Sequence, residues 1–394
     1  MNAPGRILVR GVNWLGDAVM STPALLRLRT AYPDAHIALL TPVKLADIWR
    51  HHPAIDAIME FAPGESIFKL ASRLRAAAFD TALILPNSPR SALEAYLAGI
   101  PRRVGAAFRW RNLFLTVRVP SRPEAVRMHK PSRREIERRI AKAARPSLSP
   151  QAHHVYHYLH LAAALGADPL PLAPAIAVMP PEVQAVRERF QVPSTPLLGL
   201  NPGAEYGPAK RWPEDRFVAV AVELHRRLGC HWWVFGGSRD VELASAIAHQ
   251  INAAGAKAEA KPGLAARCLA GQTSLRELCA ALSACDLVLT NDSGPMHLAA
   301  AVGTPVVVPF GSTSPELTKP GLPDDLPDLN AAASAVSYGG ATQGQPIAAP
   351  RHQILRASAA CSPCFLRVCP IDFRCMTEIS VEKVVTAMIE ALRR

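Results

Sequence analysis

The chain has 394 residues, of which 49% are hydrophobic, so it can bury sizeable cores and is not a wholly disordered polymer. Its formal net charge of +12 favours a polyanionic partner such as nucleic acid, an anionic membrane or a phosphorylated substrate. No apolar run reaches the roughly 18 residues of a membrane span, and the N-terminus MNAPGRILVRG lacks the apolar core of a secretory signal. We therefore expect a cytoplasmic protein and, because single cores rarely exceed about 250–300 residues, one with two domains.

The first half of the chain alternates strand-like runs with helical patterns. The predicted strands are apolar runs at 6–11, 36–42 and 81–86, and segments between them, such as PALLRLRTAYP, carry apolar residues at helical spacing. A further helix is predicted at 153–166. This alternation predicts a parallel sheet flanked by helices, which we assign to an N-terminal Rossmann-like domain at 1–170.

The loop GVNWLGDA at 11–18 joins the first predicted strand to the first helix. Its two glycines have the spacing of the first half of a phosphate-binding loop, but Asp17 stands where that motif needs lysine and Ala18 where it needs Ser or Thr. Because a carboxylate repels phosphate, this loop does not bind a phosphate. Asp17 is either an N-cap for the following helix or a group with a chemical role.

A strongly basic segment follows in the sequence. Between Arg127 and Arg145 the chain has a surplus of six positive charges. The segment is either a solvated helix face or a docking patch for an anionic surface. The candidate docking residues are Arg133, Arg134, Arg138 and Arg139. Nucleic acid is not expected as the partner, because the segment lacks interleaved aromatic residues and we find no nucleic-acid-binding module elsewhere.

Prolines and a second series of strand-like runs mark the second half. The proline-rich stretch 171–196 predicts an interdomain linker that contains one short helix, EVQAVRERF. The strand and helix patterns then restart, which predicts a second Rossmann-like domain at 197–377 with a loop-like insertion at about 321–360, closed by a C-terminal helix at 378–394. Two facing domains of this kind leave a cleft between them, where open sheets bind ligands at the carboxyl ends of their strands.

Three loops of the second domain follow predicted strands and have the residues of an anion site. In NDSGPMHLAAAVGTPVVVPFG at 291–311, Asp292 and Ser293 are predicted to cap a helix whose N-terminus binds a diphosphate, with His297 in its first turn. NPGAEYGPAKRWP at 201–213 presents Lys210 and Arg211 side by side, and two such cations suit phosphate oxygens. The third loop is VFGGSRD at 234–240. The candidate donor-binding residues are Asn201, Gly203, Lys210, Arg211, Gly236, Gly237, Asp292, Ser293, Gly294, Pro295, Met296 and His297.

Each of these loops also has a structural explanation, as a capped helix or a solvated turn. Three such loops in one domain nevertheless favour a nucleotide or nucleotide-sugar site. None of them fits G-x-G-x-x-G followed by a distant acid, which argues against a nicotinamide site.

Four cysteines lie within fifteen residues near the C-terminus. Cys361, Cys364, Cys369 and Cys375 are separated by two, four and five residues, so their thiols can hold a structural zinc ion or stay free. No set of residues elsewhere suggests a catalytic metal.

Taken together, GVNWLGDAVMSTPAL, NPGAEYGPAKRWP and NDSGPMHLAAAVGTPVVVPFGSTSP resemble the ADP-heptose:lipopolysaccharide heptosyltransferases of glycosyltransferase family nine, and most closely their type II members. The resemblance covers the first 40 residues and most of 197–320. It implies a GT-B fold, with the acceptor bound mainly by the N-terminal domain and ADP-heptose by the C-terminal one.

The resemblance also implies a reaction: inverting, metal-independent transfer of L-glycero-D-manno-heptose to the inner core of lipid A. Asp17 matches the family's proposed base, and Lys210 matches the lysine near the donor phosphates. The implied partners are ADP-heptose, a heptosylated Kdo-lipid A acceptor and the anionic inner membrane of a Gram-negative bacterium, at whose cytoplasmic face the enzyme works. No cofactor is implied, and we expect a monomer. The alternatives are a type I or III heptosyltransferase, another family-nine transferase, a nucleotide-sugar epimerase or a non-catalytic membrane-surface protein.

Overall fold

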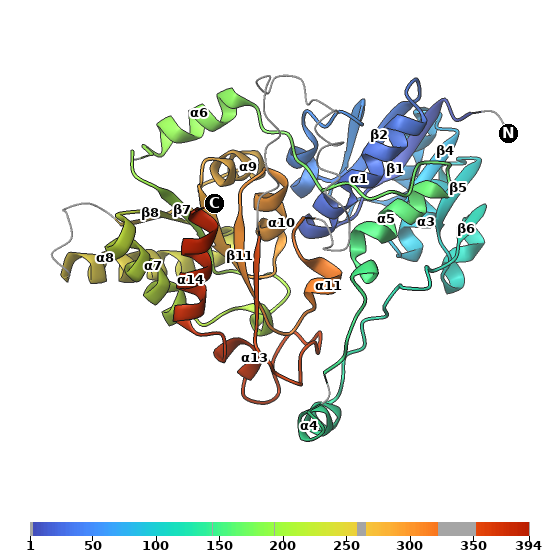
Figure 1. Ribbon diagram of the computed structural model, residues 1–394. Coiled ribbons are helices and arrows are strands. Elements are labelled where there is room, and N and C mark those ends of the chain that lie inside the picture. The colour runs from blue at the N-terminus through green and yellow to red at the C-terminus, as the bar shows by residue number, and fades with distance from the viewer. Residues whose placement is uncertain (1–2, 144, 193, 258–264, 322–351, 394) are drawn as a thin grey trace. The chain divides into compact units, whose positions relative to one another are not determined.

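The computed structural model describes residues 3–143, 145–192, 194–257, 265–321 and 352–393 (Figure 1). The chain forms two compact units. Among the described residues, unit 1 comprises 3–125 and 151–177, and unit 2 comprises 126–150, 178–321 and 352–393. The basic segment therefore belongs to unit 2, although it lies inside the sequence range expected for the N-terminal domain.

Unit 1 is built on a parallel six-stranded sheet with the order β3-β2-β1-β4-β5-β6. Its strands are β1 (Arg6–Arg10), β2 (His36–Pro42), β3 (Ala57–Phe61), β4 (Thr81–Ile84), β5 (Arg102–Ala106) and β6 (Val117–Val119). Ile7 of β1 is in register with Ile37 of β2 on one side and with Thr81 of β4 on the other. The strand order changes direction between β1 and β4, so the carboxyl end of β1 lies at the point where sheets of this type bind ligands.

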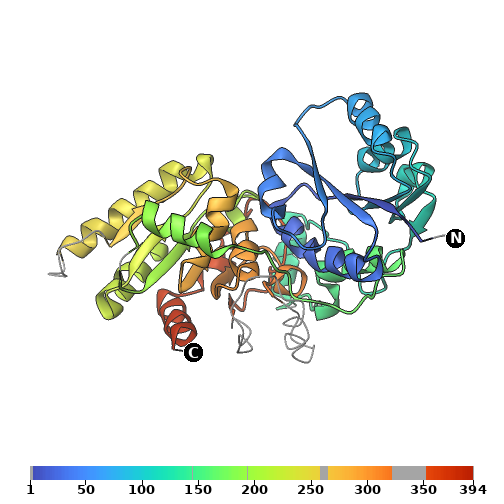
Figure 2. The same cartoon turned by 90° about the horizontal axis from the view of Figure 1, so that it is seen from above.

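Helices cover both faces of this sheet (Figure 2). They are α1 (Leu15–Ala31), α2 (Ile67–Ala76), α3 (Pro89–Leu97) and α5 (His154–Ala163), with 3-10 turns η1 (Val43–Trp49), η2 (Arg109–Phe114) and η3 (Pro150–Ala152). Helices α1 and α5 pack against each other, whereas α2 and α3 share a core with Leu8 and Leu40 of the sheet. The α1–α5 contact brings residues from the two ends of the unit 1 sequence together.

Unit 2 repeats the topology with a second parallel sheet, in the order β12-β11-β10-β7-β8-β9. Its strands are β7 (Leu197–Asn201), β8 (His231–Val234), β9 (Ala266–Cys268), β10 (Leu287–Thr290), β11 (Val306–Phe310) and β12 (Gln353–Arg356). The first strand of the unit, β7, again lies at the centre beside β10, as Leu198 and Leu287 show by their pairing. The change of direction therefore falls between β7 and β10, which places the loops that follow these two strands at the expected ligand position.

The helices of unit 2 are α4 (Arg133–Ala141), α6 (Pro180–Arg189), α7 (Glu214–Leu228), α8 (Val241–Lys257), α9 (Leu275–Ser283), α10 (Gly294–Ala301), α11 (Pro315–Thr318), α13 (Arg374–Thr377) and α14 (Val381–Leu392), with 3-10 turns η4 (Pro208–Lys210) and η5 (Ser238–Asp240). Helices α7, α8 and α14 share the main core of the unit with β7 and β8. Ile136 of α4 is buried in the same core, which explains why the basic segment belongs to unit 2. None of the described helices is both long and apolar enough to cross a membrane.

The segment predicted as a loop-like insertion at about 321–360 is a strand at its C-terminal end. β12 lies beside β11 and extends the sheet, with Gln353 opposite Val307. The prediction failed here because QILR is only partly buried at the sheet edge and does not stand out as an apolar run. Residues 322–351 of the predicted insertion lie outside the described residues.

Candidate functional site

Asp17 lies in the first turn of α1, directly after the loop that follows β1. The N-cap of this helix is Trp14, not Asp17, so the simple capping role considered for this carboxylate is wrong. The phenol of Tyr158 on α5 donates a hydrogen bond of 2.8 Å to Asp17 Oδ1, and His154 Nδ1 lies 3.9 Å from the same oxygen. Asp17 Oδ2 has no hydrogen-bond partner within the described ranges. The carboxylate is therefore held on one side and open on the other.

Two aromatic neighbours of Asp17 have shifted pKa values. Burial, together with the negative charge of Asp17, raises the pKa of Tyr158 well above its ordinary value, so the phenol keeps its proton and acts as a donor. Burial lowers the pKa of the neighbouring His157 to about 4, so this imidazole is neutral. With its side chain 32% exposed, Asp17 can reach a substrate from its open side.

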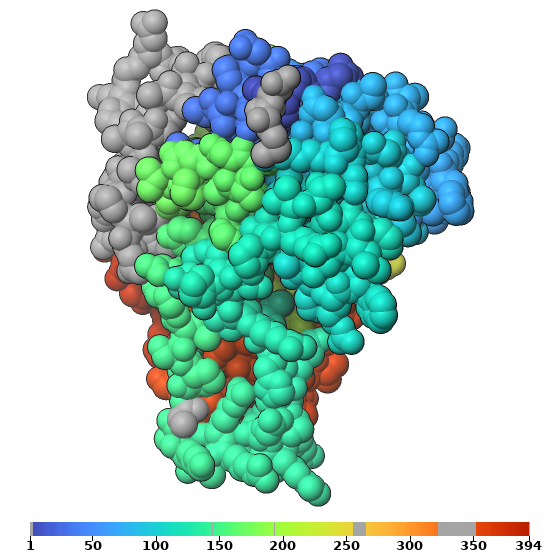
Figure 3. All heavy atoms as spheres, turned by 90° about the vertical axis from the view of Figure 1, so that its right-hand side faces the viewer, coloured from blue at the N-terminus to red at the C-terminus, as the bar shows by residue number. Residues whose placement is uncertain are grey.

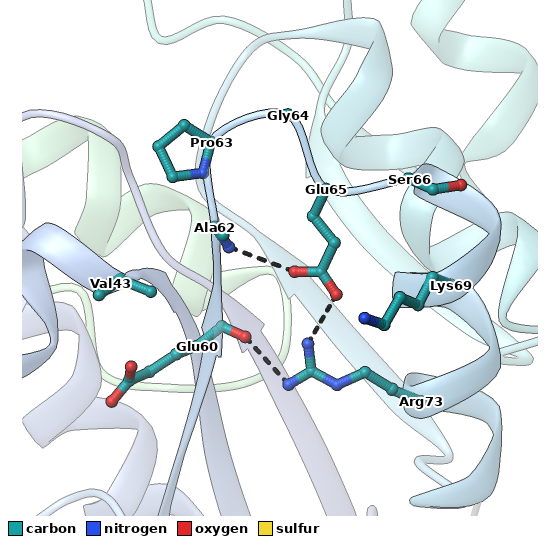
Figure 4. A pocket seen from close by; sticks show the side chains of 9 residues that line it. All are labelled: Val43, Glu60, Ala62, Pro63, Gly64, Glu65, Ser66, Lys69 and Arg73. Atoms are coloured by element: carbon teal, nitrogen blue, oxygen red, sulfur yellow. Dashed lines mark hydrogen bonds and ion pairs between the residues drawn. The ribbon is translucent and has the colours of Figure 1, made fainter.

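An open pocket of about 620 Å³ lies in the same unit, beside the carboxyl end of β3 (Figure 4). Its lining residues are Val43, Glu60, Ala62, Pro63, Gly64, Glu65, Ser66, Lys69 and Arg73. Arg73 donates to the Glu65 carboxylate at 2.9 Å and to the main-chain oxygen of Glu60 at 2.9 Å, so its charge is used within the wall. Lys69 has no hydrogen bond or ion pair among the residues that the structure describes, and its charge is available to a ligand.

The pocket and Asp17 are connected through neighbouring residues. Lys44 stacks over the Trp14 ring, with the ammonium 5.5 Å from the ring centroid. Trp14 precedes Asp17 by three residues, and Val43, beside Lys44, lines the pocket. The contact between Lys44 and Trp14 therefore places the segment after β2 beside the Asp17 loop.

In unit 2, Lys210 and Asp292 meet at the point where the strand order changes direction. Lys210 comes from the loop after β7 and Asp292 from the loop after β10, and the distance between Lys210 Nζ and Asp292 Oδ2 is 2.7 Å. Thr313, in the loop after β11, donates to the same carboxylate oxygen at 2.5 Å, and Thr318 of α11 contacts the other oxygen at 3.4 Å. One carboxylate thus ties three loops together.

This ion pair is buried, with side-chain exposures of 13% for Lys210 and 3% for Asp292. Burial by itself would raise the pKa of the Asp292 carboxyl, but the charge and hydrogen bonds of Lys210 and Thr313 outweigh it and hold the pKa below its ordinary value. The carboxylate is therefore ionised, and it fixes the position of the lysine ammonium. The prediction that Asp292 caps α10 is wrong, because Lys210 engages its side chain.

The loops around this pair are fixed by two buried asparagines. The amide of Asn201 donates to Ser293 Oγ at 3.2 Å and to Thr290 Oγ1 at 3.3 Å. Asn291 accepts a hydrogen bond of 2.9 Å from the main-chain N–H of Trp212 and donates one of 2.7 Å to the main-chain oxygen of Pro202. Asn201 therefore supports the site through the loops, and not through a free side chain.

Helix α10 begins at Gly294, with Ser293 as its N-cap residue and Pro295 in its first turn. The Ser293 hydroxyl makes no side-chain cap, contrary to the prediction, because it accepts from Asn201. Met296 is fully buried in the core, so only its main chain can face a ligand, and His297 is 6% exposed. An uncapped helix N-terminus beside Lys210 retains N–H groups for an anion.

Gly203, in the loop after β7, and Gly236, in the loop after β8, make room for the side chain of Asp240. A Cβ at Gly203 would lie 2.9 Å from the Asp240 carboxyl, and one at Gly236 would lie 2.8 Å from Asp240 Cβ. The main-chain N–H of Gly237 donates to Asp240 Oδ2 at 3.1 Å, and Arg211 lies 3.9 Å from Asp240 Oδ1. The two loops therefore approach each other closely only because these positions are glycine.

The basic segment presents its arginines unequally. The structure describes α4 with a capping box between Ser132 and Glu135, and Figure 3 shows its outer surface in green at the bottom of the view. Arg133 pairs with Glu137 at 2.9 Å, and Arg139 donates to the main-chain oxygen of Pro363 at 3.3 Å. Arg134 and Arg138 are exposed. Two of the four candidate docking arginines are thus engaged within the unit, and the other two are exposed.

The four C-terminal cysteines lie around one cavity of about 10 Å³, to which Ile136 of α4 also contributes. A hydrogen bond between the two thiols lowers the pKa of Cys361 to about 7 and raises that of Cys375. Across the described ranges, no group of three or more His, Cys, Asp or Glu side chains is arranged to hold a metal ion. The structure therefore does not support the zinc hypothesis.

Several residues of these sites were not predicted from the sequence. They are Tyr158, His154, Thr313, Thr318, Asn291 and Asp240. Thr313, Asn291 and Asp240 lie inside quoted motifs, so the motifs themselves contained a signal for them. Tyr158 gave no local signal, because its partner Asp17 is 141 residues away.

Two parallel sheets with the same Rossmann-type strand order, each with polar groups where that order changes direction, are the architecture of the GT-B fold. The sequence model of glycosyltransferase family 9 (heptosyltransferase) matches residues 67–326 of this chain. The chain belongs to this family.

Named relatives and a solved structure to which the chain is similar are also heptosyltransferases. The chain is 31% identical over 328 residues to lipopolysaccharide heptosyltransferase 2 of Escherichia coli K12, covering 80% of this chain and 85% of the relative. It is 29% identical over 327 residues to lipooligosaccharide heptosyltransferase 2 of Haemophilus influenzae, with coverages of 80% and 85%. The solved structure of E. coli ADP-heptose lipopolysaccharide heptosyltransferase II is similar over 98% of both chains, with 27% identity and a TM-score of 0.71.

Proposed function

We propose that this protein transfers L-glycero-D-manno-heptose from ADP-heptose to the inner-core heptose of lipopolysaccharide, with inversion at the anomeric carbon and without a metal ion. The single observation that carries the proposal is the division of chemistry between the units. Unit 1 holds a carboxylate with one open oxygen, and unit 2 holds a lysine fixed by a buried carboxylate at a helix N-terminus. The first suits an acceptor hydroxyl and the second a nucleoside diphosphate.

Asp17 is the general base in this proposal. The open oxygen, Oδ2, takes the proton from the acceptor hydroxyl as that oxygen attacks the anomeric carbon. Tyr158 holds the other oxygen and, with its raised pKa, does not compete for the proton. The bond from the anomeric carbon to the ADP oxygen breaks on the opposite side, which inverts the configuration.

Lys210 stabilises the departing ADP. Negative charge grows on the diphosphate as the bond breaks, and preorganised cations and N–H groups stabilise such charge most effectively where water is scarce. Asp292 holds the ammonium in place before the donor arrives, so little reorganisation is needed. The N-terminus of α10 adds main-chain N–H groups to the same anion site.

The pocket of unit 1 is the acceptor site in this proposal. Its lining has two acidic residues, Glu60 and Glu65, and two basic residues, Lys69 and Arg73. Arg73 is paired with Glu65, which leaves Lys69 to bind an anionic group of the sugar acceptor. For an acceptor anchored in the inner membrane, the exposed Arg134 and Arg138 of α4 provide contact with the anionic cytoplasmic surface.

The test is a transfer assay with purified protein, ADP-heptose and a series of truncated lipid A acceptors, read by mass in the presence and absence of a chelator. The proposal predicts one added heptose on the monoheptosylated acceptor, with the same rate in chelator. Asp17→Asn should keep ADP-heptose affinity and lose transfer. Normal turnover by this variant would refute the role of Asp17, and transfer only to an unheptosylated acceptor would refute the assigned acceptor.

A further inference from the structure

A short turn in unit 1 exposes apolar side chains that the proposed reaction does not use. In η2 and the residue before it, Phe108 is 55% exposed, Trp110 73% and Leu113 66%. These three side chains define the 108–113 patch. Large apolar side chains gathered on one turn are unusual on a soluble surface and indicate an interaction site.

Hydrogen bonds of Arg111 and Asn112 hold the main chain of this turn, so the exposure of the three apolar side chains does not come from a loosely held loop. The Arg111 guanidinium is fully buried and donates to the main-chain oxygens of Ala106 and Ile84. Gly105 makes room for it, since a Cβ there would lie 2.7 Å from an Arg111 nitrogen. The Asn112 side chain accepts from the main-chain N–H of Phe108 at 2.8 Å.

The sequence on either side of the patch carries basic side chains and no acidic ones. Between Glu94, which is buried and paired with Arg10, and Glu124, the sequence contains six arginines and no Asp or Glu. Arg109 and Arg118 of this stretch are exposed. The segment forms part of the teal surface that faces the viewer in Figure 3. An occupant must therefore accept Trp and Phe side chains and be negatively charged.

We propose that the 108–113 patch inserts into the interfacial layer of an anionic phospholipid bilayer. Trp and Phe are favoured at the level of the lipid headgroups, and exposed arginines beside them are attracted to anionic lipid. A second copy of this chain is a poor occupant, because a two-fold contact would bring the same arginines against each other. The inference adds a lipid contact in unit 1 to the α4 contact of unit 2, and it relies on the proposed function only for placing the acceptor in a membrane.

The test compares two variants of the full-length protein in flotation with vesicles of phosphatidylcholine alone or of phosphatidylcholine and phosphatidylglycerol. The first variant replaces all three patch residues with serine. The second, Phe68→Ser, is a matched control, because Phe68 on α2 is also 73% exposed and lies in the same unit. We expect the triple variant to lose about tenfold or more in partitioning to the anionic vesicles, and the control to match the wild type.

Depth of insertion is read from tryptophan quenching by phosphatidylcholine with brominated acyl chains. Quenching should disappear in Trp110→Phe and persist in Trp14→Phe, since Trp14 lies at the Asp17 loop. Equal partitioning of the triple variant and the control, or quenching that persists in Trp110→Phe, would overturn the inference. A change in sedimentation velocity caused by the triple variant would also overturn it, since the patch would then be a subunit contact.

Transfer assays separate this inference from the proposed function. The triple variant should transfer heptose to a deacylated, soluble acceptor at the wild-type rate, but more slowly to an acceptor embedded in vesicles. If no transfer occurs with any acceptor, the proposed function fails, whereas the flotation result still decides the lipid contact.

Discussion

Replacing Lys210 by Met should separate the contribution of the Lys210–Asp292 pair to stability from the contribution of Lys210 to donor binding. The substitution leaves the carboxylate of Asp292, which is 3% exposed, without its countercharge, and breaking a buried pair in this way costs about 3–5 kcal/mol. Thr313 still donates one hydrogen bond but supplies no charge. Adding Asp292→Asn removes the stranded charge, so the double variant should recover most of this loss, with a coupling energy of about 2–3 kcal/mol.

The wild type, the two single variants and the double variant form a double-mutant cycle. Across these four proteins, ADP affinity should not follow the free energy of unfolding. Lys210→Met removes a charged hydrogen-bond donor to the diphosphate, which is worth about 1.5–3 kcal/mol, or roughly a 10- to 100-fold weaker Kd for ADP. The double variant has no lysine either, so its ADP affinity should stay low although its stability returns.

Two measurements complete the cycle. Urea unfolding of unit 2 is followed by fluorescence of its buried tryptophans, Trp212, Trp232 and Trp233. ADP affinity is measured by calorimetry on the same four proteins. If Lys210→Met leaves the unfolding midpoint unchanged, the buried pair is not as described. If ADP affinity returns together with stability, Lys210 acts only through folding and does not contact the donor.

Two further outcomes are expected in unit 1. Tyr158→Phe removes the hydrogen bond that orients Asp17, so kcat should fall about tenfold with KM for ADP-heptose unchanged, and an equal rise in KM would point to a purely structural effect. Burial lowers the pKa of His52 to about 4, and its Nε2 has no hydrogen-bond partner in the described chain. Below about pH 6.5 the unfolded state therefore binds a proton at His52, whereas the folded state does not. Lowering the pH from about 7.5 to about 5 should therefore reduce the free energy of unfolding by about 2 kcal/mol through this group. Urea unfolding at both pH values should show a smaller loss in His52→Gln; an equal loss would exclude His52 as the cause.

The strands that could be predicted from the sequence are those at the centre of each sheet. β1, β2 and β4 in unit 1, and β7, β8, β10 and β11 in unit 2, are mostly buried along their length and therefore are apolar runs. The missed strands, β3, β5, β6, β9 and β12, lie toward the sheet edges. Their sequences, such as RRVGA and VRV, mix arginine with apolar residues because one side is solvated. Edge strands form because a neighbouring strand offers them hydrogen bonds, which no local pattern records.

For the candidate site, too, the sequence located some features and not others. The loops after β1, β7 and β10 could be located from the sequence, because a strand end, glycines and a following helix are all local features. Their side-chain partners could not be located. Lys210 and Asp292 are 82 residues apart, and Asp17 and Tyr158 are 141 residues apart. The expected capping role of Asp292 failed for this reason, since a buried lysine from another loop is a stronger partner than an N–H group of the helix.

By itself, the sequence determined that this is an α/β protein with two Rossmann-like halves, an acidic loop in the first and anion-binding loops in the second. Periodicity, glycine spacing and charge are properties of neighbouring residues, and these features depend on nothing else. The tertiary structure alone decided that Tyr158 holds one oxygen of Asp17, that Asp292 fixes Lys210, and that the basic helix α4 packs in unit 2 through Ile136. Each of these contacts joins segments that are distant in the chain. A hydrogen bond and an ion pair hold the first two and burial of an apolar side chain holds the third, and local propensity records none of them.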